Sequence, residues 1–193
     1  AGAPGVGSTV SYMRSGVSAR EMFEVQKVGA RCGRPTGAHT RYTLGTDTSE
    51  VNGAQELIAN AMALGAPAIV LHYNNPGWRV THELISGLQE RGFNIWGEIY
   101  PYAAGSTTIN AEFLVPEVWI DEMGNRYEDT MLDPVTNKYY TLETYKATVA
   151  SEPARPIVVF KMPKEDEAKW LTLKGVTMAS DAVGAMPYDA PWD

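Results

Sequence analysis

The chain has 193 residues, 44% of them hydrophobic, and a formal net charge of -7, as expected of an acidic folded domain rather than a disordered segment. The negative charge, together with the lack of a Lys and Arg run interleaved with aromatic residues, argues against nucleic acid as a partner. A membrane partner is also not expected, because the longest apolar stretches, such as 66–71, are far shorter than the roughly 20 residues that span a bilayer.

The first predicted helix begins at a capping box. Ser18 and Glu21 have the spacing at which the serine side chain accepts a hydrogen bond from a first-turn amide and the glutamate reaches back. We therefore expect a helix over about 18–30. Residues 36–43 follow a Cys-Gly-Arg-Pro stop and are partly β-branched, which predicts a short strand. This strand carries His39 and Arg41.

A second helix and a buried strand come next. Hydrophobic residues recur at helical spacing over 51–64, and Gly65 suits the left-handed position that ends a helix. Residues 66–72 are mostly apolar up to His72, as expected of a parallel strand that is covered on both faces. The strand leads into a polar cluster that contains Asn74.

The alternation of helix and strand then repeats once before it breaks down. Thr81 is placed to cap a helix that ends at Gly92, and residues 93–100 have the pattern of a further buried strand. This order predicts a parallel sheet with right-handed connections. Residues 110–155 are rich in aromatic, acidic and turn residues, and we interpret them as an insertion over one face. Regular elements are expected again at 157–160, about 164–171 and 175–181.

Three predicted strands place a side chain that can bind metal at or near the carboxyl end, which is the reactive face of parallel α/β folds. These side chains are His39, His72 and Asp181. Imidazole nitrogen and carboxylate oxygen are suitable zinc ligands, and zinc lowers the pKa of a water molecule from about 15.7 to about 7. Spacing alone also allows a structural role for each residue, because strand-end histidines are often hydrogen-bonded in the core and aspartate after serine is common in turns.

Four segments, spread over nearly the whole chain, form an ordered set of motifs. They are Gly37-Ala-His-Thr-Arg41, Ile69-Val-Leu-His-Tyr-Asn74, Gly97-Glu-Ile-Tyr-Pro-Tyr-Ala-Ala-Gly-Ser106 and Gly175-Val-Thr-Met-Ala-Ser-Asp181. In this order they resemble the D-aminoacylases and N-acyl-D-glutamate deacylases of the amidohydrolase superfamily. Four motifs in order are far more specific than any one of them.

The resemblance implies an α/β fold, namely the second half of a (β/α)8 TIM barrel of the metal-dependent amidohydrolase type, with an insertion before the last strand. Residues 1–193 would supply about strands 5–8, and the N-terminal half of the barrel is absent from this sequence. By motif position, His39 and His72 would be metal ligands from the fifth and sixth strands. Asp181 would be the general base from the eighth strand.

The chain also departs from the family pattern. The family's His-x-His pair and its cysteine ligand would lie upstream, so we expect only part of the metal site here. Cys32 falls on the opposite face of such a barrel, and we interpret it as a buried or partly buried small hydrophobe. At the position of Asn74, D-aminoacylases carry a basic residue that holds the substrate carboxylate. Arg41 or Arg79 could take over the role of that basic residue in this chain. The candidate substrate-binding residues are Tyr100, Tyr102, Arg41, Asn74 and Ser106.

The function that these inferences favour is zinc-dependent hydrolysis of the amide bond of N-acyl-D-amino acids or similar non-peptide C–N bonds. One alternative is a non-catalytic half-barrel that serves as an assembly or binding module and is inactive as this fragment. Another is a metal-free barrel enzyme with Tyr102 and Asp181 as acid and base. Half a barrel would expose unpaired strand edges and apolar surface, which predicts self-association or a partner chain that completes the barrel.

Overall fold

A computed structural model of the chain describes residues 2–13, 16–41, 52–162 and 164–181. The last residues of the strand expected at 36–43, and the first residue of the helix expected at 51–64, lie outside the described residues. Within the described part, no helix is long and apolar enough to cross a membrane.

Five parallel strands form the main sheet, in the order β1-β2-β3-β4-β9. Each neighbouring pair is parallel, which confirms the predicted type of sheet. The sheet has one strand more than the sequence patterns indicated, because β1 precedes the first predicted helix. The strands are β1 (Val6–Thr9), β2 (Thr36–His39), β3 (Ala68–Val70), β4 (Ile95–Ile99) and β9 (Val176–Met178).

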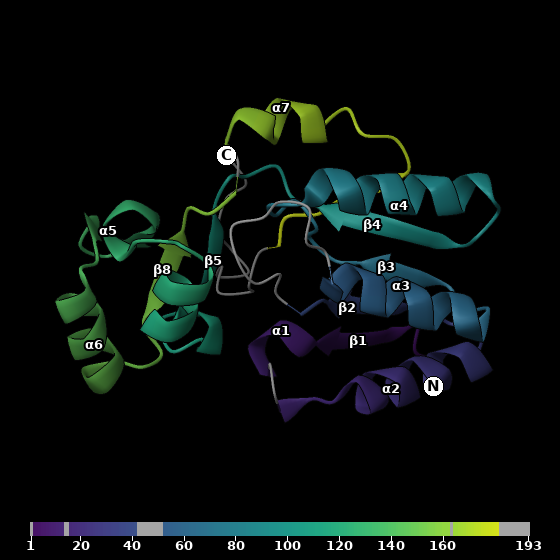
Figure 1. Cartoon of the computed structure of the whole chain (residues 1–193), viewed down its shortest axis with the longest axis horizontal. Helices are drawn as coiled ribbons and strands as arrows, with labels where there is room; N and C mark the ends of the chain where they lie inside the picture. The colour runs from purple at the N-terminus through teal and green to yellow at the C-terminus, as the bar shows by residue number, and fades with distance from the viewer. Residues whose placement is uncertain (1, 14–15, 42–51, 163, 182–193) are drawn as a thin grey trace.

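Helices connect these strands and pack against them, α2 on β1 and β2, α3 on β3, and α4 on β4 (Figure 1). The capping box of Ser18 and Glu21 is present, with Ser18 Oγ accepting a hydrogen bond from the Glu21 backbone N–H. A short α1 follows β1, and a turn of 3-10 helix leads into α7 ahead of β9. The helices are α1 (Val10–Met13), α2 (Ala19–Arg31), α3 (Asn52–Leu64), α4 (Trp78–Glu90), η4 (Lys164–Asp166) and α7 (Glu167–Trp170).

Glycines in the left-handed region mark the ends of these helices. Gly65 and Gly92 have φ values of 59° and 83°, as their positions after α3 and α4 predict. The start of α4 differs from the prediction, because Gly77 with φ 88° is the N-cap and Thr81 lies inside the helix. Thr81 is buried and its N–H bonds to the Gly77 carbonyl, so it does not cap the helix.

A second, antiparallel sheet is built from the chain between β4 and β9, in the order β5-β8-β6-β7. It includes most of the irregular segment expected at 110–155 but begins earlier and ends later. The strand expected at 157–160 is β8 and belongs to this sheet, where it pairs with β5 and β6. The elements are β5 (Gly105–Thr108), η2 (Glu112–Leu114), the π-helical η3 (Glu117–Glu122), α5 (Tyr127–Thr130), β6 (Met131–Asp133), β7 (Lys138–Tyr139), α6 (Leu142–Ser151) and β8 (Pro156–Val159).

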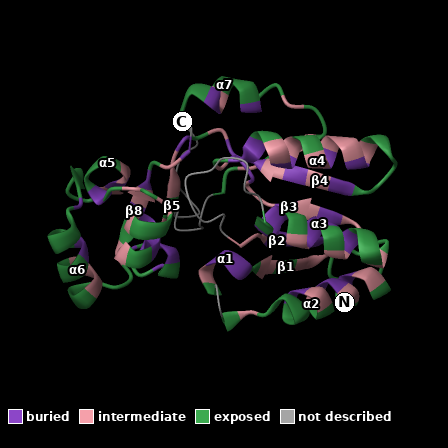
Figure 2. Cartoon of the chain, viewed as in Figure 1, coloured by how far each residue is buried: buried purple, intermediate pink, exposed green. Residues whose placement is uncertain are grey.

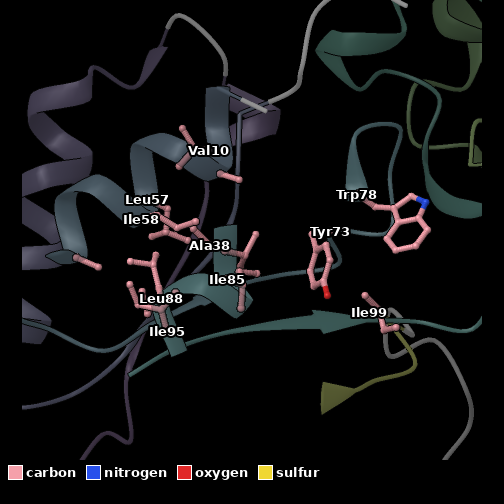
Figure 3. Packing of buried hydrophobic residues seen from close by; sticks show 14 of the residues in the cluster. Val10, Ala38, Leu57, Ile58, Tyr73, Trp78, Ile85, Leu88, Ile95 and Ile99 are labelled. Carbon is pink, nitrogen blue, oxygen red and sulfur yellow. The ribbon is translucent and has the colours of Figure 1, made fainter. Parts of the chain in front are cut away.

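Each sheet has its own hydrophobic core. In the first, Leu57 and Ile58 of α3 and Ile85 of α4 pack near Ile95 of β4 (Figure 3). The second core gathers aromatic side chains such as Phe113 and Trp119, while most of α6 remains exposed (Figure 2). Cys32 is exposed, contrary to the expectation of a buried small hydrophobe, because it is the C-cap of α2 at the end of the sheet away from His39.

Candidate functional site

The predicted metal-binding side chains follow the ends of separate parallel strands. His39 is the last residue of β2, His72 lies just beyond β3, and Asp181 lies beyond β9. Because all the strands of this sheet run in the same direction, their carboxyl ends share one edge. The fold therefore brings together three residues that are far apart in the sequence.

The two histidines are in direct contact. Their ring centroids lie 4.6 Å apart, and the planes meet edge to face at 84°. Asp181 Oδ1 is 3.7 Å from His72 Nδ1, so the carboxylate joins the same group. Tyr12 of α1 extends this cluster, with its ring centroid 5.1 Å from that of His39.

Glu98 of β4 is a member of the site that the sequence patterns did not single out. Its Oε1 lies 3.3 Å from His72 Nδ1, and its backbone carbonyl accepts a hydrogen bond from the N–H of Tyr73. The signal that could have identified it is a charged side chain within the buried strand expected at 93–100. Glu98 and Asp181 thus approach the same imidazole nitrogen of His72.

Two site residues have unusual backbone conformations. His72 and Asp181 have φ values of 32° and 50°, and Asn137 is the other described non-glycine residue at positive φ. Such conformations cost about 1–3 kcal/mol each and cluster at functional sites, where the surrounding structure holds them in place. The backbone therefore leaves the extended conformation at His72, after β3, and at Asp181, after β9.

Burial determines the protonation of the cluster. Burial lowers the pKa of His39 to about 3, with further lowering from the nearby charges of His72 and Lys161, so His39 is neutral near pH 7. Burial raises the pKa of Asp181, and the Glu98 charge raises it too, whereas His72 acts in the opposite direction. A neutral imidazole beside a carboxylate of raised pKa suits metal binding and proton transfer.

Two adjoining cavities open at this edge. The smaller, about 30 Å³, is lined by His39, His72, Asp181 and Lys161 among others. The larger, about 800 Å³, is lined by Tyr102 and by residues of β5 and β8. Both cavities are lined by Tyr12, Tyr100, Gly105, Ser106, Thr107 and Asp181.

Three candidate substrate-binding residues are grouped at the cavities. Tyr100 is buried and Tyr102 is half exposed, and their rings stack with centroids 6.0 Å apart. Burial raises the pKa of Tyr100, with the Asp181 charge as a further cause, so its hydroxyl remains protonated. Ser106 lies on β5, and its Oγ donates a hydrogen bond to the Ile157 carbonyl.

The other candidates are engaged elsewhere. Asn74 is fully buried, and its Nδ2 donates to the backbone carbonyls of Tyr100 at 3.1 Å and Tyr102 at 3.5 Å. Arg41 Nε bonds to Glu56 Oε2 at 2.7 Å. Arg79 Nη2 bonds to Asp166 Oδ1 at 2.7 Å, and neither arginine is among the described residues that line the two cavities. Asn74 therefore supports the tyrosine segment from within.

Lys161 is a further site residue that the sequence patterns did not single out. It lies just beyond β8 of the antiparallel sheet and lines the smaller cavity with both histidines. Its Nζ is 5.9 Å from the centre of the Phe113 ring, and burial lowers the pKa of its amine to about 7. Nothing in the local sequence of Lys161 indicates this position, because the pairing of β8 with β5 determines it.

The described residues fit zinc in chemistry but supply only part of a site. Neutral imidazoles and a carboxylate are suitable donors, and His39 and His72 already lie side by side. Across the described ranges, however, no group of three or more His, Cys, Asp or Glu side chains is arranged to hold a metal ion. Further ligands would be needed to complete the coordination.

Comparison with known proteins gives a clear structural result. No family model and no curated protein sequence matches the chain. One matching structure is that of N-acyl-D-glutamate deacylase from Bordetella bronchiseptica, complexed with zinc and a phosphonate inhibitor that mimics the tetrahedral intermediate of the reaction. The match covers 94% of this chain and 40% of the deacylase chain, with a TM-score of 0.68 and 21% sequence identity. A D-aminoacylase structure that defines a subset of amidohydrolases matches 93% of this chain and 39% of its own, with a TM-score of 0.67 and 20% identity.

These matches confirm, at the level of the fold, the resemblance noted from the sequence motifs. The chain spans about 40% of the length of the matched deacylase. A second D-aminoacylase structure, concerned with the role of a binuclear metal centre, matches with the same TM-score of 0.67. At 20–21% identity, the matches to N-acyl-D-glutamate deacylase and D-aminoacylase show that this chain shares part of their fold.

Proposed function

We propose that the chain forms the second half of the catalytic barrel of a metal-dependent amidohydrolase. The parallel strands β1 to β4 and β9 would be consecutive barrel strands, and the antiparallel sheet would be an insertion before the last strand. The observation that carries the proposal is the meeting of His39, His72 and Asp181 at the carboxyl edge of the sheet. The similarity in fold to D-aminoacylase and N-acyl-D-glutamate deacylase supports the same assignment.

The proposed reaction is hydrolysis of the amide bond of N-acyl-D-amino acids. His39 and His72 would hold zinc, together with ligands from the other half of the barrel. When bound, zinc would supply Lewis-acid chemistry, making a water molecule more acidic and polarising the amide carbonyl. N-acyl-D-amino acids are proposed because the structural relatives are deacylases of such compounds.

Asp181 would move the proton in this reaction. Its carboxylate is suited to accept a proton from the attacking water and then donate it to the nitrogen of the leaving amine. The raised pKa of Asp181 favours the first of these steps, because a carboxylate of higher pKa is a stronger base, and a pKa closer to the working pH suits a group that must both take up and release a proton. Its position in both cavities places it between the histidines and the space for substrate.

The larger cavity would bind the substrate. Tyr102 and Ser106 line this cavity. Tyr102 can offer its hydroxyl group to the acyl or carboxylate oxygens, and Ser106 could do so by turning its O–H away from the Ile157 carbonyl. Tyr100 lies between the two cavities, with its ring centroid 5.9 Å from that of His72. Asn74 would hold Tyr100 and Tyr102 in place through their backbone carbonyls.

The test is a paired measurement of zinc content and amidase activity on the protein that contains this chain and the remaining barrel strands. We expect bound zinc, and release of free D-amino acid from N-acetyl-D-amino acids but not from the L-isomers. Loss of activity on chelation and its return with added zinc would support the metal-dependent step. A zinc-free protein that hydrolyses none of these substrates would contradict the proposal.

The partial ligand set favours a second candidate, a non-catalytic half-barrel that binds another protein chain. Such a module would retain its fold and its partner without zinc. Measurement of zinc content, together with the association of the chain with its partner, distinguishes the two functions. If the chain is a binding module, substitution of His39 and His72 should change neither the metal content nor the assembly.

A further inference from the structure

Lys161 reaches the proposed catalytic centre from the antiparallel sheet. It lies beyond β8, whereas His39 is the last residue of β2 and His72 and Asp181 follow β3 and β9 of the parallel sheet. All four line the smaller cavity, and the charge of Lys161 contributes to the lowered pKa of His39. The proposed reaction, as described so far, has no role for this amine.

We propose that Lys161, in its protonated form, stabilises the negative charge that develops on the substrate carbonyl oxygen during amide hydrolysis. The inference rests on the proposed function, because it assigns a second electrostatic group to the same site. A cation placed where charge develops, in a space that excludes most water, lowers the barrier more than it would in solvent.

The shape of the site favours the carbonyl oxygen over the substrate carboxylate as the group that Lys161 meets. Lys161 lines the cavity of about 30 Å³, which has room for a water-sized group, and does not line the cavity of about 800 Å³. A substrate in the larger cavity would project its reacting carbonyl into the smaller one. Its carboxylate would remain near Tyr102 and Ser106.

The position of the other candidate cations supports this assignment. Arg41 and Arg79 line neither of the two cavities as described. Among the described residues that line the two cavities, Lys161 is the one lysine or arginine. The cationic partner of a developing oxyanion on this side of the site is therefore Lys161.

The step balances without another reactant. Asp181 accepts a proton from water as the water oxygen bonds to the carbonyl carbon, and the π electron pair of the C=O bond moves onto oxygen beside the Lys161 ammonium. When that pair re-forms the carbonyl, the C–N bond breaks and its electrons go to nitrogen. The nitrogen takes the proton from Asp181, which gives an amine and a carboxylic acid that ionises in water.

The test compares Lys161→Met with Lys164→Met in the zinc-loaded protein with a complete barrel. Methionine keeps the length of the side chain without its charge, and Lys164 is an exposed lysine nearby. The first readout is calorimetric binding of a phosphonate analogue whose tetrahedral group replaces the scissile amide. The second is the separation of kcat from KM on the N-acyl substrate.

We expect Lys161→Met to weaken phosphonate binding and lower kcat by about 100- to 1,000-fold, the usual effect of losing one oxyanion donor, with KM changed little. Zinc content should remain unchanged, Lys164→Met should match the wild type, and Lys161→Arg should retain part of the binding. An increase in KM alone would overturn the inference and make Lys161 a carboxylate anchor. Equal phosphonate affinity in Lys161→Met and wild type would also overturn the inference about Lys161. A wild-type protein that binds no phosphonate and cleaves no substrate would instead refute the proposed function itself.

Discussion

Glu98 Oε1 lies 3.3 Å from Nδ1 of His72, so a carboxylate on β4 holds the imidazole that follows β3. A histidine engaged at Nδ1 is left with Nε2 for a metal ion, and metal-binding histidines commonly have such a carboxylate partner. We therefore expect Glu98 to orient His72 rather than to contact metal or substrate itself.

Substitution of the site histidines should remove zinc. We expect His39→Ala and His72→Ala to lose most of the bound metal, because each would remove an imidazole donor from the site. Glu98→Gln should weaken zinc binding by about 10- to 100-fold, the usual effect of removing an orienting partner. Metal analysis after dialysis against a weak chelator measures these changes.

His82 provides the matched control for the zinc measurement. His82 is on α4, and it is not among the described residues that line the two cavities. Its Nδ1 lies 3.0 Å from the Tyr73 hydroxyl. His82→Gln should therefore retain the metal. Equal zinc content in all three histidine variants would argue against a metal site at His39 and His72.

The parallel half of the fold was predictable because its signals are local. Capping at Ser18, glycines after helices and continuous apolar strands predicted the helices, the strands and the edge at which His39, His72 and Asp181 meet. β1 was missed because Val6–Thr9 is short and alternates between partly exposed and exposed residues. A buried parallel strand normally has a continuous apolar run, which this segment lacks.

The antiparallel half depends on pairings that are distant in sequence. Its strands are two to four residues long, and Ser106 faces Val158 across a long excursion of the chain. No local pattern predicts that pairing, so Lys161 could not be placed beside the histidines from sequence. Glu98 was missed for another reason, because its strand was predicted only as a buried strand and no role was assigned to the charged residue within it.

Removal of the proposed base should reduce turnover. We expect Asp181→Asn to lower kcat by about 100- to 10,000-fold, the usual contribution of a positioned acid or base, with KM changed less. Because burial and Glu98 raise the pKa of Asp181, the acid limb of kcat/KM should lie above the ordinary value for aspartate. Steady-state kinetics across pH test both expectations, and full activity in Asp181→Asn would exclude this residue as the base.

The metal-free protein should lose stability on acidification through His39. The pKa of His39 falls from 6.5 in the unfolded chain to about 3 in the folded chain, chiefly through burial. Between pH 6.5 and pH 3, therefore, the unfolded chain binds a proton at His39 that the folded chain does not. The stabilisation is fully present above pH 6.5 and is lost as pH falls toward 3. Urea unfolding at pH 7 and pH 5 should show a smaller pH dependence in His39→Asn, and an unchanged dependence would contradict the buried neutral state.

Asn74 should matter for stability as well as for activity. We expect Asn74→Ala to lower the free energy of unfolding by about 1–3 kcal/mol, because the buried carbonyl of Tyr100 would lose its donor. Displacement of the two tyrosines should also raise KM. Denaturant unfolding and kinetics measure these effects, with exposed Asn94→Ala as the control. Equal stability of the two variants would show that Asn74 does not hold the tyrosine segment.

The edges of the parallel sheet predict how the isolated chain behaves. Among the described strands, β1 and β9 each pair with one neighbour, and Met178 on β9 is half exposed. Unpaired strand edges with apolar side chains recruit other strands, so the 193-residue chain alone should self-associate. A chain that supplies the other strands of the proposed barrel should suppress this association. Light scattering should show less association for Met178→Lys than for the unchanged chain, since a charge on an edge strand opposes pairing. The control is Val135→Lys, which changes an exposed turn of the other sheet and should leave the association unchanged. A monodisperse monomer that ignores the added chain would mean that these edges are already protected.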